Sequence, residues 1–473
     1  MLPKLTKITT LKESNSVAIL LNSPEQLPKN LLTESEFMYL KNKLEKGDDC
    51  TIYKHPYILF FGKVIEKKEN YLQTEAARVA GAKLFDILKA ENIKSVQLVN
   101  FSCTELIANF LEGILLSGYS FTKYKKGKNE FELEEIFVLD ETVSESWFSE
   151  MLNLTQAVFY ARDLVNEPPS YLTAAKFSEE ISKMGKEAGF SVEIFNKKKI
   201  ETIRMGGLLA VNKGSIDPPT FTIIEWKPEN AVNSSPVVLV GKGLVFDTGG
   251  LSLKPTQKSM DYMKCDMAGG AVVAATVYAA AKNKLPVYVV GLVPATDNRP
   301  GGNAYAPGDI ITMYDDTTVE IKNTDAEGRL LLADALSFAK KFNPKLVIDI
   351  ATLTGAAAIV AGNHAIVGMG NSKESMEKLK QTGFETYERI IEVPLWDEYA
   401  KPLKSKIADL NNHGSREAQS TVAGKFLEHF TDYNWIHLDA AGASFLFEKD
   451  TYRPEGGTGF GIRLLYNFLK KIN

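Results

Sequence analysis

Short apolar runs alternate with stretches of helical periodicity along this chain, and this alternation restricts the fold more than any other feature. In the longer, second part of the chain the strand-like runs are 236–246, 285–295, 345–353 and 435–443, and the helix-like segments are 268–283, 328–342 and 460–471. Strands that alternate with helices predict a mostly parallel sheet flanked by helices. We therefore expect an α/β fold.

The first third of the chain repeats the pattern on a smaller scale, with strand-like runs at 17–21, 57–61 and 95–101 and helix-like segments at 70–91 and 104–119. One helix is predicted over 147–165, and Pro168-Pro169 end it because proline cannot continue a helix. The expected domains are an N-terminal α/β domain at 1–145, a connecting helix and linker at 146–170, and a larger α/β domain at 171–473.

Composition excludes several classes of protein. The 473 residues are 44% hydrophobic and 24% charged, as in an ordinary globular protein, and the net charge of −4 makes nucleic acid an unlikely partner. The three cysteines form no CxxC motif, which suits a reducing compartment. Since neither an apolar leader nor a run of about 18 apolar residues occurs, we expect a cytoplasmic protein without a membrane partner.

Acidic residues are expected at three strand ends. Asp247 follows the run 236–246 and precedes Gly249-Gly250, Asp266 precedes the small-residue helix, and Asp325 and Glu327 stand two apart on a stretch expected to be extended. Ligands gather beyond the carboxyl ends of parallel strands. If these four carboxylates meet, their repulsion requires cations, and two divalent ions would balance them and activate a bridging water.

The alternative is that each acid is placed separately. A single Asp at the end of a strand is commonly a helix cap or a surface charge, and Asp266 is a good candidate for the cap of the following helix. From the residues alone, the metal site and the separate acids both remain open.

Three motifs are more specific: GKGLVFDTGGLSLKP (241–255), MDYMKCDMAGGA (260–271) and NTDAEGRLLLADAL (323–336). They closely resemble the leucyl aminopeptidase family of hexameric, two-metal exopeptidases. The similarity extends over about 160–473, and the eight residues NTDAEGRL are similar to the family's signature. The resemblance implies that 171–473 is the catalytic domain and that 1–145 is a variable domain involved in assembly.

The resemblance also implies roles for individual residues. The implied metal ligands are Lys242, Asp247, Asp266, Asp325 and Glu327, which would hold two divalent ions, zinc or manganese, with magnesium or cobalt possible at the exchangeable site. Lys254 would be the catalytic lysine and Arg329 would hold a bicarbonate ion. As a ligand Lys242 must be a neutral amine, so burial beside two cations has to lower its pKa.

The implied reaction releases N-terminal amino acids, preferentially leucine and other apolar residues, from short peptides with a free N-terminus. A hydroxide that bridges the metals would attack, Lys254 would polarise the carbonyl, and the bicarbonate would carry the proton. The subunits would form a homohexamer, a dimer of trimers. The implied substrate-binding residues are Met263, Asp266, Thr352, Leu353, Gly355, Ala441 and Ser444.

Other interpretations remain. Lys242 could be an ordinary ion-pair partner of neighbouring acids, and Lys254 could be a surface residue. Arg329 could form a salt bridge with Asp325 or Glu327. A two-metal phosphatase would share the carboxylates but would not need Lys242 as a ligand. A non-enzymatic oligomeric scaffold would be favoured by the loss of any one ligand, and here all five are present. The chain departs from the family pattern by one extra residue between Lys254 and Asp266, and by Ser444 in place of a larger apolar residue, which weakens a strict preference for leucine.

Overall fold

The computed structural model describes residues 2–12, 15–63, 67–127 and 131–472. The chain divides into two compact units, one formed by Met1–Gln156 with Glu448–Glu455 and the other by Ala157–Phe447 with Gly456–Asn473. The division falls inside the long helix α4 (Glu145–Asn166), which the sequence predicts as one helix. The pattern of apolar residues in the sequence does not indicate that Glu448–Glu455 belong to the first unit.

The first unit is built on a six-stranded sheet with the order β1-β6-β5-β2-β4-β3. All neighbouring strands are parallel except β3 and β4. The strands are β1 (Lys4–Lys7), β2 (Val17–Leu21), β3 (Cys50–Lys54), β4 (Tyr57–Lys63), β5 (Ser95–Asn100) and β6 (Glu135–Leu139).

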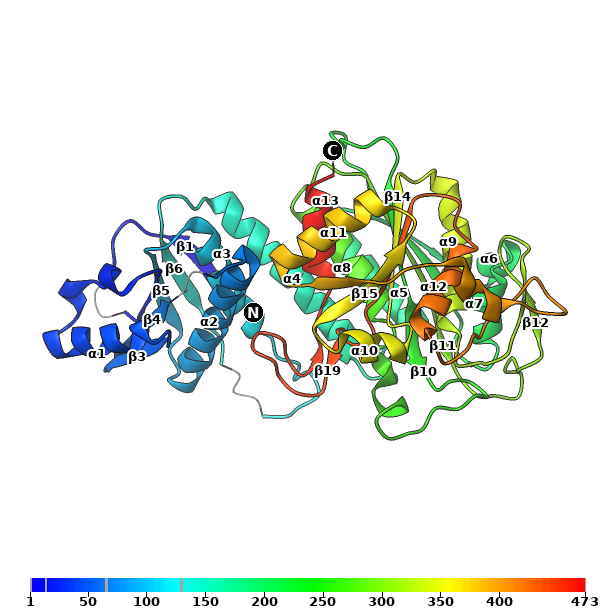
Figure 1. Ribbon diagram of the computed structural model, residues 1–473, viewed down its shortest axis with the longest axis horizontal. Helices are drawn as coiled ribbons and strands as arrows, with labels where there is room; N and C mark the ends of the chain where they lie inside the picture. The colour runs from blue at the N-terminus through cyan, green and yellow to red at the C-terminus, as the bar shows by residue number, and fades with distance from the viewer. Residues whose placement is uncertain (1, 13–14, 64–66, 128–130, 473) are drawn as a thin grey trace. The chain divides into compact units, whose positions relative to one another are not determined.

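Helices cover both faces of this sheet (Figure 1). Along β2, Val17, Ile19 and Leu21 share a core cluster with α1 (Glu34–Glu45), whereas Ala18 and Leu20 share another with α2 (Asn70–Ala90) and α3 (Thr104–Ser117). Because successive side chains of a strand point to opposite faces, the wholly apolar run of β2 is explained by burial on both sides.

The second unit is built on a nine-stranded sheet with the order β16-β15-β18-β14-β9-β11-β8-β7, in which β10 also pairs with β11. Its strands are β7 (Ser191–Phe195), β8 (Thr220–Trp226), β9 (Val237–Gly241), β10 (Gly243–Asp247), β11 (Val289–Asn298), β14 (Leu346–Ala351), β15 (Ala365–Gly370), β16 (Arg389–Glu392) and β18 (Trp435–Asp439). The central strands β11, β9, β14 and β18 are parallel, which confirms the predicted α/β fold with a mostly parallel sheet.

Helices and small sheets complete the second unit. The helices are α5 (Ala174–Ala188), α6 (Lys197–Thr202), α7 (Gly206–Asn212), α8 (Ala268–Lys282), α9 (Gly328–Ala339), α10 (Gly355–Ala361), α11 (Lys373–Thr386), α12 (Gln419–Glu428) and α13 (Ile462–Lys470), together with the 3₁₀ helix η3 (Met260–Cys265). The short strands are β12 (Ile310–Thr312), β13 (Thr318–Glu320), β17 (Leu410–Asn411), β19 (Phe445–Leu446) and β20 (Gly456–Gly457). Among the described residues, no helix is long and apolar enough to cross a membrane.

The run 236–246, predicted as one strand, is two strands separated by Lys242. The carbonyl of Lys242 accepts a hydrogen bond of 2.8 Å from the Gly270 amide in α8, so it leaves the sheet ladder. The chain then pairs further along β11, with Gly243 opposite Ala295. This break places the Lys242 side chain at the carboxyl end of β9.

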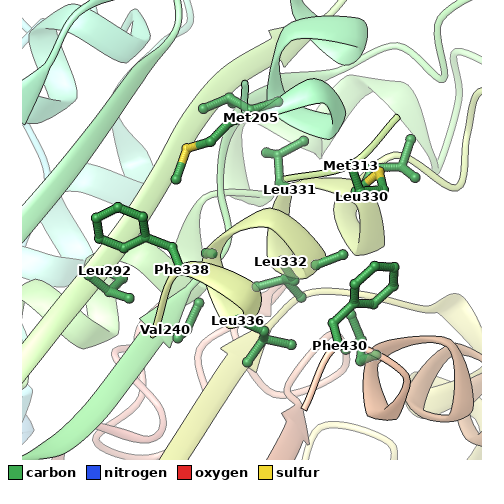
Figure 2. Close-up of a cluster of buried hydrophobic side chains, with 14 of the residues drawn as sticks. Met205, Val240, Leu292, Met313, Leu330, Leu331, Leu332, Leu336, Phe338 and Phe430 are labelled. Carbon is green, nitrogen blue, oxygen red and sulfur yellow. The ribbon is translucent and has the colours of Figure 1, made fainter. Parts of the chain in front are cut away.

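Helix α9 begins with the last three residues of the NTDAEGRL motif and lies in the hydrophobic core. Every residue of the helix is buried. Leu330, Leu331, Leu332, Leu336 and Phe338 lie among apolar side chains of the sheet and of neighbouring helices (Figure 2). A helix buried on all sides is fixed in position by packing, because a shift would open cavities around it.

A buried carboxyl group fixes α9 further. Asp334 accepts hydrogen bonds of 2.9 Å from the Leu208 and Tyr314 amides. Burial raises the pKa of Asp334 to about 7, in spite of these bonds. These two bonds join α9 to α7 and to the segment after β12.

Candidate metal centre

Lys242 and Asp266 form the most buried part of the site. The Lys242 ammonium lies 2.8 Å from both carboxylate oxygens of Asp266, 3.0 Å from Glu327 Oε1 and 3.1 Å from the Thr352 carbonyl. Thr352 also donates its hydroxyl to Asp266 Oδ1 at 2.6 Å. Since Lys242 follows β9 and Thr352 follows β14, these contacts join the carboxyl ends of two adjacent strands.

A second group contains three carboxylates. Asp247, Asp325 and Glu327 offer oxygen atoms that all lie within 4.8 Å of one another. The Lys254 ammonium lies 2.9 Å from Asp247 Oδ2 and 2.6 Å from Asp325 Oδ1. Glu327 reaches Lys242, and the two groups are therefore one continuous cluster.

Two glycines allow this close approach. Gly249 has a φ of +85°, and a Cβ atom there would lie 2.8 Å from Asp325 Oδ1. A Cβ atom on Gly328 would lie 2.6 Å from Lys242 Cε. A larger residue at either position would separate the charged groups.

Neighbouring side chains hold the carboxylates in place. Asn298, at the end of β11, donates from Nδ2 to Asp247 Oδ1 at 2.9 Å and to the Thr324 carbonyl at 3.0 Å. Thr324 donates its hydroxyl to the Gly249 carbonyl at 2.6 Å. This network ties the loop after β10 to the NTDAEGRL motif.

The charges in the cluster influence one another strongly. Burial raises the pKa of Asp325 to about 7, and the carboxylates of Glu327 and Asp247 add to the effect. Burial opposes the charged form of Lys242, but the carboxylates of Asp266, Glu327 and Asp247 outweigh it and hold its pKa above the ordinary value. The lowered pKa that a lysine ligand requires would therefore depend on bound cations and not on the protein alone.

An unpartnered oxygen atom, in addition to the composition of the cluster, indicates that the cluster can hold divalent cations. Within the described part of the chain, the buried Glu327 Oε2 has no hydrogen-bond partner. A buried carboxylate oxygen without a partner costs free energy, and a cation would remove that cost. Asp247, Asp325 and Glu327 are the residues best placed to hold such an ion, with Lys242 and Asp266 beside them.

Arg329, the second residue of α9, is 4% exposed. Its Nε and Nη1 atoms have no hydrogen-bond partner among the described residues, so the salt bridge to Asp325 or Glu327 considered above is not formed. Burial lowers the pKa of Arg329 to about 10, although Glu327 and Asp439 oppose the shift. A buried guanidinium with unused donors suits a small oxyanion.

Three interpretations of the sequence were wrong. Asp266 does not cap α8, because the N-cap is Met267 and no side chain caps this end, while the carboxylate of Asp266 bonds to Lys242 and Thr352 instead. Asp325 and Glu327 do not lie on an extended stretch, since Asp325 is in a turn and Glu327 has helical dihedral angles of −80° and −38°. Lys254 is not a surface residue, as its side chain is 15% exposed.

The predicted substrate-binding residues occupy three neighbouring segments. Met263 lies on η3, Thr352 and Leu353 follow β14, and Gly355 begins α10, where a Cβ atom would meet open space. Ala441 and Ser444 follow β18, and the buried Ser444 donates its hydroxyl to the Ala440 carbonyl at 2.9 Å.

Asp439 was missed in the sequence and holds two of these segments together. Its Oδ1 accepts from the amides of Leu353 at 3.1 Å and Ala441 at 3.3 Å, and its Oδ2 accepts from the Thr354 hydroxyl at 2.7 Å. In the sequence, this role could have been inferred only from the position of Asp439 at the end of β18, directly before Ala440. Asp439 is 1% exposed, so its role is to fix the loops rather than to meet solvent.

A second group of residues that was not predicted from the sequence lies on the adjacent strands β14 and β18. His437 Nδ1 is 2.5 Å from Asp349 Oδ1, and the Trp435 indole donates to Asp349 Oδ2 at 2.6 Å. His437 and Asp349 are paired across β14 and β18. The carboxylate of Asp349 thus joins the two strands that carry the substrate-binding loops.

A mostly parallel α/β sheet with carboxylates, two lysines and an arginine gathered at its strand ends defines a metal-dependent hydrolase. Residues 159–466 match the model of the cytosol aminopeptidase family, catalytic domain. The chain belongs to the cytosol aminopeptidase family, and its activity is that of an aminopeptidase.

Relatives and solved structures agree with this assignment. The chain is 46% identical to a probable cytosol aminopeptidase of Chlorobaculum tepidum over 383 residues, which cover 77% of this chain and 75% of the relative. It is 42% identical to one of Chloroherpeton thalassium over 425 residues, 85% of this chain and 81% of the relative. The bottromycin maturation enzyme BotP in complex with Mn is similar in structure, with a TM-score of 0.85, 27% identity and coverage of 96% and 98% of the two chains.

Proposed function

We propose that this chain is a two-metal aminopeptidase of the leucyl type. It releases N-terminal amino acids, with leucine and other apolar residues preferred, from short peptides. The observation that carries the proposal is the convergence of Lys242, Asp247, Asp266, Asp325 and Glu327 in one buried cluster with an unpartnered carboxylate oxygen. Such a cluster requires cations, because four carboxylates and two lysines leave a net negative charge out of water.

Two divalent ions, zinc or manganese with magnesium or cobalt as possible occupants of the exchangeable position, would supply charge neutralisation and activation of water. Lys254 would polarise the scissile carbonyl, and its ammonium 2.9 Å from Asp247 Oδ2 and 2.6 Å from Asp325 Oδ1 supports this role. The carboxylates keep the pKa of Lys254 above its ordinary value despite burial, so it is a permanent cation at neutral pH.

Arg329 would hold a bicarbonate ion, whose chemistry at this position is to carry a proton from water to the leaving amine. The unused Nε and Nη1 donors of this buried side chain support the role. None of the five histidines in the sequence lies in the cluster as described, so no imidazole competes for the role.

The substrate requires a free N-terminus in this proposal. Its amine would bind at the Asp266 side of the cluster, and the first side chain would lie near Met263, Thr352, Leu353 and the segment that contains Ala441 and Ser444. An apolar pocket separates side chains that differ by one methylene by only about 1–3 kcal/mol, so specificity is broad. Assembly into a homohexamer, which rests on the family resemblance, and a cytoplasmic location, which is expected from the composition, complete the proposal.

Hydrolysis of leucine p-nitroanilide, N-acetyl-leucine p-nitroanilide and p-nitrophenyl phosphate by the same metal-loaded preparation tests the proposal. We expect the free anilide to be cleaved and the other two to be left intact. Equal cleavage of the acetylated anilide would contradict the need for a free amine. Preferential cleavage of the phosphate ester would favour the two-metal phosphatase instead.

The role of Arg329 is tested separately by adding bicarbonate to bicarbonate-depleted enzyme. We expect bicarbonate to stimulate the original protein, and Arg329→Ala to be slow at all bicarbonate concentrations. Identical stimulation of both proteins would contradict the assignment of the anion to Arg329.

A further inference from the structure

A cavity of about 560 Å³ lies in the first unit, and none of its lining residues belongs to the metal centre. Residues that follow β1, β5 and β6 line it, together with Ile19 of β2 and the connection between β2 and α1. Its volume is within the range of small-molecule sites, which is about 300–1,000 Å³.

The cavity lies where the topology of the sheet favours a ligand. The neighbouring parallel strands β2 and β5 lead to helices on opposite faces, since α1 packs with Val17 and Ile19 whereas α3 packs with Ala18 and Leu20. Connections that diverge in this way leave a crevice beyond the carboxyl ends of the two strands. Strand β5 and the helices α1 and α3 are labelled in Figure 1.

One wall of the cavity is a fixed acceptor group centred on Asp140. Asn100 Nδ2 donates to Asp140 Oδ2 at 2.7 Å, and the Thr142 amide and hydroxyl donate to Oδ1 at 2.8 and 2.5 Å. Asn100 is held in turn by Ser102, whose amide and hydroxyl donate to its Oδ1 at 2.9 and 2.6 Å. Burial raises the pKa of Asp140, but the bonds from Thr142 and Asn100 outweigh it and lower the pKa, so a charged acceptor faces the cavity.

The charges around the cavity disfavour an anion. Its charged residues are Lys7, Asp140 and Glu141, and the Lys7 ammonium is occupied by the carbonyls of Glu141 and Val143 at 2.8 and 2.9 Å. Among the described residues that line it, none is a glycine, so the wall has no glycine-rich loop of the kind that binds phosphate. The uncapped N-terminus of α3 at Cys103 is a feature that would favour an anion, and the experiment below tests it.

The remaining wall is apolar. Ile19 and Val99 present the sheet face, and Leu11, Leu31 and Leu139 lie around them in the same hydrophobic cluster. Phe101, which is 41% exposed, also lines the cavity. An apolar slot beside a fixed acceptor suits a flat ring that carries hydrogen-bond donors.

We propose that this cavity binds a neutral nucleoside, with its hydroxyl groups donating to the Asp140 group and its base lying against Ile19, Val99 and Leu31. Hydroxyl donors replace the water that the carboxylate would otherwise bind, while a phosphate group would meet Asp140 and Glu141. The proposal is independent of the aminopeptidase reaction, because all lining residues belong to the first unit.

Cys103 provides an internal probe. It lines the cavity and is exposed, whereas Cys50 and Cys265 are buried and the pKa of each of these thiols is raised by burial. A thiol reagent applied to the folded full-length protein should label Cys103 first. We expect adenosine to slow this labelling in a saturable manner, and AMP to protect less well than adenosine.

Two variants locate the binding. Ser102→Trp should fill the cavity, and Asp140→Asn should remove the charged acceptor, so that each weakens protection by adenosine about tenfold or more. Lys89→Trp, on the exposed end of α2 and outside the cavity, is the matched control and should leave protection unchanged.

The outcomes decide the proposal. Absence of protection by adenosine and by uridine, with ordinary labelling of Cys103, would overturn it. Stronger protection by AMP than by adenosine would also overturn it, in favour of an anion at the α3 N-terminus. If Ser102→Trp does not fold, Asp140→Asn and the adenosine–AMP comparison still decide the question.

Discussion

Both units of the molecule place polar side chains at the carboxyl ends of parallel strands, but the two sites differ in burial. In the second unit Lys242, Asp247, Asp266 and Glu327 are 1–4% exposed. In the first unit Asp140 is only partly buried, and the neighbouring Glu141 and Thr142 are exposed.

This difference in burial determines which kind of ligand each site can bind. Carboxylates that face water keep their charge without help, and such a site can recognise a neutral molecule through hydrogen bonds. Carboxylates removed from water need opposite charge within a few ångströms, which the two lysines supply only in part. The same architectural rule therefore produces a cation site in one unit and a pocket for a neutral ligand in the other.

The largest expected effect comes from removing cations. Chelation should abolish aminopeptidase activity, and Mn²⁺ or Zn²⁺ should restore it, because the carboxylates would otherwise repel one another. Protection of Cys103 by adenosine should be unchanged by the same treatment, since the first unit does not depend on the cations. If elemental analysis shows that the protein is free of metal and the protein is still fully active, the two units do not differ in their need for cations.

Replacing a buried lysine should cost far more than replacing an exposed one. Lys254→Met should lower kcat by about 10²–10³-fold, as expected for loss of a group that stabilises the oxyanion. Lys83→Met is the matched control in the first unit, because Lys83 pairs with Asp49 at 2.7 Å but its side chain is 59% exposed. Steady-state kinetics on both variants is the measurement, and similar losses would show that Lys254 acts only on stability.

Loosening the substrate loops should have an intermediate effect. Asp439→Ala removes the acceptor for Leu353, Thr354 and Ala441 and should lower kcat/KM by about 10²-fold through misplacement of the substrate. Asp439→Asn, which keeps an acceptor oxygen, should recover part of the loss. Exposed Asp432→Ala is the control. An unchanged KM and kcat in Asp439→Ala would contradict the positioning role.

The smallest effect concerns stability and its dependence on pH. Because the pKa of Asp334 is raised to about 7, the folded protein holds this proton more tightly than the unfolded chain. Its contribution to stability is therefore greatest below the ordinary pKa near 4 and declines as the pH rises towards 7. Asp334→Asn should cost about 1–3 kcal/mol at pH 5, because one amide loses its acceptor, and less at pH 8. Urea unfolding at both pH values measures this, and a cost that grows with pH would contradict the assignment.

Much of the fold could be predicted from the sequence. The strand at 17–21 is found with the same bounds, and the helices predicted over 70–91 and 104–119 begin at Asn70 and Thr104. These segments have a clear period or a continuous apolar run, which local burial enforces. The antiparallel partners β7, β8 and β15 were not predicted, because their pairing depends on distant strands.

The candidate site was predicted less completely. The motifs pointed to six residues that the structure brings together: Lys242, Asp247, Lys254, Asp266, Asp325 and Glu327. Asp439 was not singled out, since its role consists of accepting hydrogen bonds from the nearby Ala441 amide and from the amides of Leu353 and Thr354, 86 and 85 residues away in the chain.

The sequence by itself determined which elements form and which charged residues follow them, because periodicity, glycines and proline breaks act on neighbouring residues. Only the tertiary structure decided how deeply each charge is buried and which groups it meets. Burial is a property of the whole packed unit: Lys242 and Lys83 are the same residue type, each beside a carboxylate, and yet the first is 2% and the second 59% exposed at the side chain.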